Sequence, residues 1–116
     1  MRKQLIVLLI ALAVAVGFSG TVFAQPAHTK HVYLQKIVPI HNGSYHPKFL
    51  TVKKGTTVIW VNKQTDSHTV TSVSGLFDSG IIEPGGHYKH TFTKTGVYPY
   101  YCTLHPKTMR GTLVVR

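Results

Sequence analysis

The 116-residue sequence has little acidic charge and almost no cysteine. Three Asp and Glu residues stand against 13 Lys and Arg, and Cys102 is the single cysteine. One cysteine cannot form an internal disulfide, and it cannot build a metal cluster held by cysteines alone. The length leaves room for one domain and not for a second folded core. The hydrophobic share of 43% is ordinary for a globular protein and argues against general disorder.

The N-terminus has the order of a secretory signal. Cationic residues precede an apolar run over residues 5–18, and small residues stand at the −3 and −1 positions of a cleavage site after Ala24. The run is shorter than the roughly 20 residues that a membrane-spanning helix needs. We therefore expect residues 1–24 to be a cleaved signal and residues 25–116 to form an exported domain, periplasmic or extracellular. An uncleaved membrane anchor is the alternative.

Export makes the single cysteine unusual. Removal of residues 1–24 takes Arg2 and Lys3 away, so 92 residues with a formal charge of +8 remain. A chain this small buries a modest core and often gains from a stabilising metal. Because cysteines in an oxidising compartment tend to pair, an unpaired thiol there needs a reason to persist. Binding a metal ion would both protect the thiol and use it.

Short β-rich segments separated by turns make up the rest of the chain. No segment after the signal shows a sustained helical period, and Thr, Val and Tyr dominate, as in strands. Six or seven strands at this spacing predict an all-β fold, a Greek-key β-sandwich or small barrel. The expected strands are 32–40, 49–52, 56–61, 69–73, 88–92, 97–102 and 112–115.

A loop between the last two expected strands is rich in metal ligands. Cys102, His105 and Met109 fall within eight residues, and His68 follows an earlier strand after a polar turn. Two His and one Cys, with a weak and long axial Met, are the ligands of blue-copper electron-transfer sites. Soft sulfur ligands suit Cu(I), and imidazole also suits copper in general.

Each of these residues also has an ordinary structural interpretation. Cys102 could be a small buried residue, Met109 could fill the core, and either histidine could be a loop residue. However, Met109 is the single methionine besides the initiator, and it and the single cysteine bracket His105 on one short loop. Coincidence explains this joint placement poorly, so we interpret the four residues as copper ligands.

The chain resembles the cupredoxins, the type 1 copper proteins of the plastocyanin, amicyanin and pseudoazurin group. The likeness covers residues 30–116 and is carried by residues 49–62, 68–70, 75–80 and 98–102. The resemblance implies one type 1 copper ion, with three equatorial ligands and one axial ligand. By that resemblance the equatorial ligands are His68, Cys102 and His105, and the axial ligand is Met109.

The ligand loop departs from the family pattern in length. Three residues separate His105 from Met109, whereas amicyanin-like proteins typically have two and plastocyanin-like proteins four. The geometry of the bond to Met109 is therefore the part of the ligand set that the resemblance constrains least. Thr69, which follows the first histidine, is expected to donate or accept a hydrogen bond that ties the ligand loops together. The alternative for Thr69 is an ordinary strand threonine.

The ligand set predicts a soluble carrier that shuttles single electrons between exported or membrane-bound partners. The alternative is a module for copper scavenging, delivery or resistance, which would use the same ligands. An enzyme is disfavoured because Asp66, Asp78 and Glu83 are the only carboxylate side chains and no nucleophile motif accompanies them. A binuclear copper centre would need a second cysteine.

The surroundings of His105 predict how partners dock. We expect its ring to reach the surface between Leu104 and Pro106, beside Lys107 and Arg110. Small interfaces are typical of transient redox encounters, and the charge of +8 predicts partners with an acidic docking face. A merely solvated basic surface is the alternative. We expect a monomer with no stable membrane insertion after signal cleavage, and no nucleic-acid binding, since no recognition motif is visible.

The other histidines match no strong metal template. Four of them lie toward the N-terminus, at positions 28, 31, 41 and 46. They are expected to be solvated loop residues, with an accessory metal site as the alternative. His90 shares a strand face with Tyr88 and Phe92, so we expect it to be partly buried and structural.

Overall fold

The computed structural model describes residues 33–116 of the protein. These residues form eight strands with the turns and loops that join them. Over this range there is no helix long and apolar enough to cross a membrane. The signal predicted at residues 1–24 lies outside the described residues and stays a prediction.

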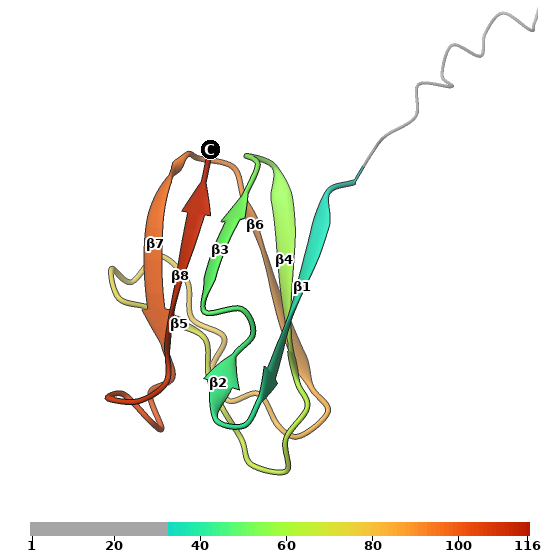
Figure 1. Cartoon of the computed structure of the whole chain (residues 1–116), viewed down its shortest axis with the longest axis vertical. Helices are drawn as coiled ribbons and strands as arrows, with labels where there is room; N and C mark the ends of the chain where they lie inside the picture. The colour runs from blue at the N-terminus through green and yellow to red at the C-terminus, as the bar shows by residue number, and fades with distance from the viewer. Residues whose placement is uncertain (1–32) are drawn as a thin grey trace, which may run out of the picture. The chain divides into compact units, whose positions relative to one another are not determined.

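Two four-stranded sheets pack against each other as a sandwich (Figure 1). The first sheet has the order β2 (Ser44–Tyr45), β1 (Gln35–His41), β4 (Thr56–Asn62) and β6 (His87–Phe92). The second has the order β3 (Phe49–Val52), β8 (Arg110–Val115), β7 (Gly96–Tyr101) and β5 (Thr71–Ser72). The pairs β1–β4 and β3–β8 are parallel, and the remaining neighbours are antiparallel. The all-β sandwich predicted from the sequence is confirmed.

The strands differ most from the prediction in two places, while the bounds of the others shift by no more than about three residues. The structure has an additional strand, β2, whose two residues are too few to show an alternating pattern. The strand expected over residues 69–73 is shortened to β5, because the backbone before it pairs elsewhere. Ser79 donates its N–H to the carbonyl of Val70 at 3.0 Å, and His68 forms an isolated bridge with Ile82.

Strand β4 supplies the centre of the core. Its residues alternate between buried and half-buried, and Trp60 is fully buried. The Trp60 ring lies 5.8 Å from that of Tyr88 on β6 and 5.4 Å from that of Tyr100 on β7, centroid to centroid. Burying an aromatic side chain of this kind stabilises a fold by about 1.5–3 kcal/mol. The Trp60 contacts therefore fix the two sheets against each other.

His90 is a structural histidine, as predicted. Its ring is half-buried and lies 4.7 Å from Phe92 and 5.1 Å from Phe77. Burial lowers the pKa of His90 below its ordinary value, which favours the neutral imidazole beside the core residues Phe77 and Phe92. All eight strands and this core lie within one compact unit, residues 33–116. That part of the chain therefore has the closed core that independent folding requires.

Candidate metal centre

Three of the residues singled out from the sequence converge at one end of the sandwich. His68, Cys102 and His105 each offer a ligand atom, and these atoms lie within 4.8 Å of one another. The Cys102 Sγ atom is 3.9 Å from Nδ1 of His68 and 3.7 Å from Nδ1 of His105. Both imidazoles therefore present the same ring nitrogen to one sulfur, across 34 residues of sequence in the case of His68.

The two sulfur–nitrogen separations are short enough for one small metal ion to bridge the sulfur and each nitrogen. Bonds from nitrogen and sulfur to a small divalent ion are about 2.0–2.3 Å long, and 3.7 and 3.9 Å are each less than the sum of two such bonds. The atoms that meet here are two imidazole nitrogens and one sulfur. This donor set matches the equatorial ligands of a blue-copper site.

The loop between β7 and β8 positions two of these residues together with Met109. Cys102 follows the end of β7, and its N–H donates to the carbonyl of Met109 at 3.0 Å. Inside the loop, the N–H groups of His105 and Met109 donate to the carbonyls of Cys102 and His105. Met109 is buried, with 1% of its surface exposed. The loop, with three residues between His105 and Met109, thus forms a closed, hydrogen-bonded turn beside Cys102.

His68 lies on the connection that carries the chain from the first sheet to the second. Its backbone N–H donates to the carbonyl of Ile82 at 3.2 Å, and the N–H of Ile82 donates back at 2.8 Å. The side chain is buried. Burial, and then the neighbouring His105 ring, lower the pKa of His68. The neutral imidazole that results is the form that binds metals.

Asn62 organises the loop in front of His68, a role that the sequence analysis missed. Its buried side chain donates to the carbonyls of Asp66 at 2.8 Å and Ile82 at 3.0 Å. Its Oδ1 atom accepts the N–H of Gln64. The sequence did carry a signal for this role, because Asn62 is polar and yet falls on the inward-facing side of the alternating strand β4. A buried amide there needs hydrogen-bond partners.

Thr69 joins the two ligand-bearing segments, as predicted. Its backbone N–H donates to Sγ of Cys102 at 3.3 Å, and its hydroxyl accepts the N–H of Thr103 at 2.8 Å. The first bond holds the sulfur in place from the segment that carries His68. The hydroxyl of buried Tyr45 donates to the Thr69 carbonyl at 2.6 Å. Burial raises the pKa of Tyr45 and keeps it a donor.

Exposure differs sharply within the centre. His68 and Cys102 are buried, whereas His105 is exposed, as the sequence predicts. Leu104, beside it, is 48% exposed. The further neighbours Pro106, Lys107 and Arg110 are also exposed. The centre thus reaches solvent through one imidazole edge, inside a surface that is apolar next to the ring and cationic around it.

The remaining histidines of the described chain form no comparable cluster. The His41 and His46 rings stack face to face, with centroids 3.7 Å apart and planes 5° apart. Because nitrogen lone pairs lie in the ring plane, those of two stacked rings point side by side and do not converge on one ion. His87 and His90 lie on β6. Within residues 33–116, the centre at Cys102 is the one group of three or more potential His, Cys, Asp or Glu ligands.

Comparisons with known proteins agree with this geometry. A family model described as a cupredoxin-like domain matches residues 8–115. Amicyanin from Paracoccus denitrificans is 37% identical over 84 residues, which cover 68% of this chain and 63% of that protein. Plastocyanin from Scenedesmus fuscus is 30% identical over 84 residues, or 62% of this chain and 86% of that protein. The matched segment thus spans less than two thirds of the amicyanin.

Solved structures give the same result for the fold. An amicyanin variant in its Cu(I) form superposes with a TM-score of 0.67 at 34% identity, covering 71% of this chain and 82% of that one. A purple cupredoxin from Nitrosopumilus maritimus gives a TM-score of 0.62 at 35% identity, covering 72% of this chain and 99% of that one.

Replacement of Thr69 tests whether its hydroxyl connects the two segments. Thr69→Val keeps the backbone N–H bond to sulfur but leaves the Thr103 N–H without its acceptor. We expect the free energy of unfolding to fall by about 1–3 kcal/mol, and bound metal to dissociate faster. Thr71→Val is the matched control, because the Thr71 hydroxyl bonds to the side chains of Thr69 and Asp78. Equal stabilities of the two variants in urea unfolding would show that Thr69 has no special connecting role.

Proposed function

Because this chain belongs to the cupredoxin family, we propose that it binds one type 1 copper ion and carries single electrons between redox partners. His68, Cys102 and His105 are the equatorial ligands, and Met109 is the axial ligand. The observation that carries the proposal is the meeting of one thiol sulfur and two imidazole nitrogens within 4.8 Å. The bound copper supplies the redox chemistry by alternating between its two oxidation states.

The residues of this chain hold the ligands nearly still. Cys102 is held by the Thr69 N–H and by its own N–H bond to Met109, while His68 is held by its bridge to Ile82. A donor set that barely moves limits the rearrangement that accompanies each transfer, so the exchange of an electron is fast. Met109, which the loop places beside Cys102, tunes the reduction potential as a weak axial ligand.

The exposed edge of His105 is the proposed route for electrons. It is the one exposed residue among the four ligands. A partner that covers the apolar surface at Leu104 and Pro106 approaches the ligand closely, and a small interface lets it leave quickly. Lys107 and Arg110 beside this surface favour a partner with an acidic docking face. The chain is proposed to work as an exported monomer that meets its partners transiently.

Copper scavenging or delivery is the second candidate, and exposure is the observation that separates it from the first. A delivery protein needs ligands that an acceptor can reach, whereas three of the four residues here are buried.

An enzyme has less support. The carboxylates of Asp78 and Glu83 accept hydrogen bonds from Thr71 and Ser67 and are exposed, so neither orients Cys102.

One experiment separates the carrier from the delivery module. The copper-loaded protein is reduced with ascorbate and reoxidised with hexacyanoferrate(III) in the presence of excess Cu(I) chelator. We expect repeated, complete cycles of an intense visible absorption band, with less than about a tenth of the copper lost to the chelator. Cys102→Ser is the control, and it should keep the sandwich but lose the band. Rapid copper transfer by the wild type favours delivery, and survival of the band in the variant contradicts the thiolate assignment.

Salt dependence tests the acidic docking face. With hexacyanoferrate(III) as a defined anionic probe, we expect the second-order rate to fall as ionic strength rises. Combined Lys107→Gln and Arg110→Gln substitutions should lower the rate at low salt by about threefold to tenfold. Lys53→Gln with Lys54→Gln removes the same charge away from His105 and should have little effect. A flat salt dependence would contradict electrostatic steering, and equal effects of the two pairs would assign it to net charge alone.

A further inference from the structure

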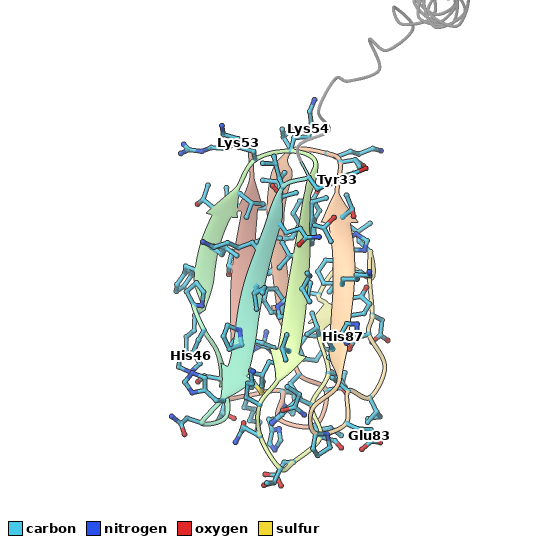
Figure 2. The ribbon with its side chains drawn as sticks, turned by 90° about the vertical axis from the view of Figure 1, so that its right-hand side faces the viewer. Tyr33, His46, Lys53, Lys54, Glu83 and His87 are labelled. Carbon is cyan, nitrogen blue, oxygen red and sulfur yellow. The ribbon has the colours of Figure 1, made fainter. Side chains whose placement is uncertain are left out.

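Cationic turns gather at the end of the sandwich opposite the metal centre. Figure 1 shows the β3–β4 turn, the β6–β7 turn and the last residue of the chain at this end. In Figure 2, Lys53 and Lys54 lie there, whereas Glu83 lies toward the other end. We call this surface, formed by the side chains of Lys53, Lys54 and Lys94, the distal pole. All three lysines are exposed.

Backbone hydrogen bonds hold these turns together. The N–H of Lys54 donates to the carbonyl of Arg116 at 2.9 Å, and the N–H of Gly55 donates to the carbonyl of Phe92 at 2.7 Å. The hydroxyl of Tyr98 donates to the carbonyl of Lys94 at 2.6 Å. The three lysines therefore stand on turns that backbone hydrogen bonds join at one end of the sandwich.

No acidic side chain offsets the distal pole. The sequence has three carboxylate side chains, and each belongs to a loop outside the pole. Asp66 lies in the loop that Asn62 closes, and Glu83 accepts the hydroxyl of Ser67 in front of His68. Asp78 accepts the hydroxyl of Thr71. The positive potential at the pole is therefore uncompensated, as is typical of a surface that binds anions.

The described chain also begins at the distal pole. Tyr33 lies there (Figure 2), and the carbonyl of Leu34 accepts the N–H of Thr57 near the start of β4. The preceding sequence is therefore joined to the domain at this surface, and it contains the apolar run 5–18 and Lys30. Even fully extended, residues 19–32 span about 45–50 Å. A membrane that received the signal predicted at residues 1–24 would therefore lie no farther than this from the start of the described chain.

We propose that the distal pole docks reversibly on an anionic membrane surface, with the three lysines among phospholipid phosphates. This orientation turns the exposed edge of His105 away from the lipid and toward redox partners. An acidic protein partner fits the pole less well. The six residues of β7 lie between the turn at Lys94 and Cys102, and a strand of that length spans about 20 Å. A protein bound at the distal pole would therefore be far from the metal centre.

Vesicle binding tests this proposal without depending on electron transfer. Copper-loaded protein starting at Gln25, which contains the whole closed core, is mixed at low salt with vesicles of phosphatidylcholine containing about a third phosphatidylglycerol. Each lysine near such a surface contributes about fivefold to partitioning. We therefore expect the protein to bind these vesicles and not to bind vesicles of pure phosphatidylcholine. It should be released in about 0.5 M salt, which is about three times the physiological ionic strength.

Matched variants assign the binding to one surface. Lys53→Gln, Lys54→Gln and Lys94→Gln combined should lower the partition coefficient by about a hundredfold. The control replaces three exposed lysines elsewhere, Lys48, Lys63 and Lys89, and should lower it by less than about fivefold. The visible absorption band reports that both variants remain folded and loaded.

Three results would overturn the proposal. The first is the absence of binding to the anionic vesicles at low salt, and the second is an equal loss in the two triple variants, which would indicate net charge alone. The third is unchanged vesicle binding in the distal variant together with loss of binding to an acidic redox protein. That result would assign the pole to a protein partner. Electron transfer can fail in all of these samples without changing the vesicle result, so this proposal and the carrier function fail separately.

Discussion

The hydrogen bond from the Thr69 backbone to the Cys102 sulfur is the interaction on which the metal centre depends. It joins a segment that crosses from the first sheet to the second with the loop that connects β7 and β8. The Thr69 hydroxyl adds a bond to the N–H of Thr103, so the connection has two points of attachment. Because His68 directly precedes Thr69, the connection fixes one imidazole relative to the sulfur. The rest of the sandwich keeps the two segments in reach of each other.

The same construction divides the centre into an enclosed part and an open part. On the buried side, the Tyr100 ring packs against that of Trp60 and meets the Tyr45 ring edge to face, with centroids 4.7 Å apart. Burial raises the pKa of Tyr100 to about 12, so both phenols stay neutral near Cys102. Opposite them, His105 is exposed. A site that is buried on one side and exposed at one ligand suits an electron carrier better than a protein that releases its metal.

Much of this organisation could be predicted from the sequence, because spacing along the chain reports it directly. Cys102, His105 and Met109 lie on one short loop, and the bounds of β3 follow from residues 49–52 alone. Spacing does not report the hydrogen-bond roles of Asn62 and Tyr45, although the alternation of β4 marks Asn62 as a buried polar residue. Their roles depend on partners 20 and 24 residues away, and such contacts exist only once the sheets are packed. Strand β2 was missed because two residues carry no periodicity. The distal pole likewise unites turns that are far apart in sequence.

The most direct test of the account is X-ray absorption at the copper edge, recorded for the oxidised and the reduced protein. The account predicts one sulfur and two imidazole nitrogens at bonding distance in both oxidation states, with bond lengths that change by less than about 0.2 Å. That result would mean that the protein holds the ligand set in place through the redox cycle. A first shell without sulfur, or one that loses a ligand or gains oxygen ligands on reduction, would contradict it.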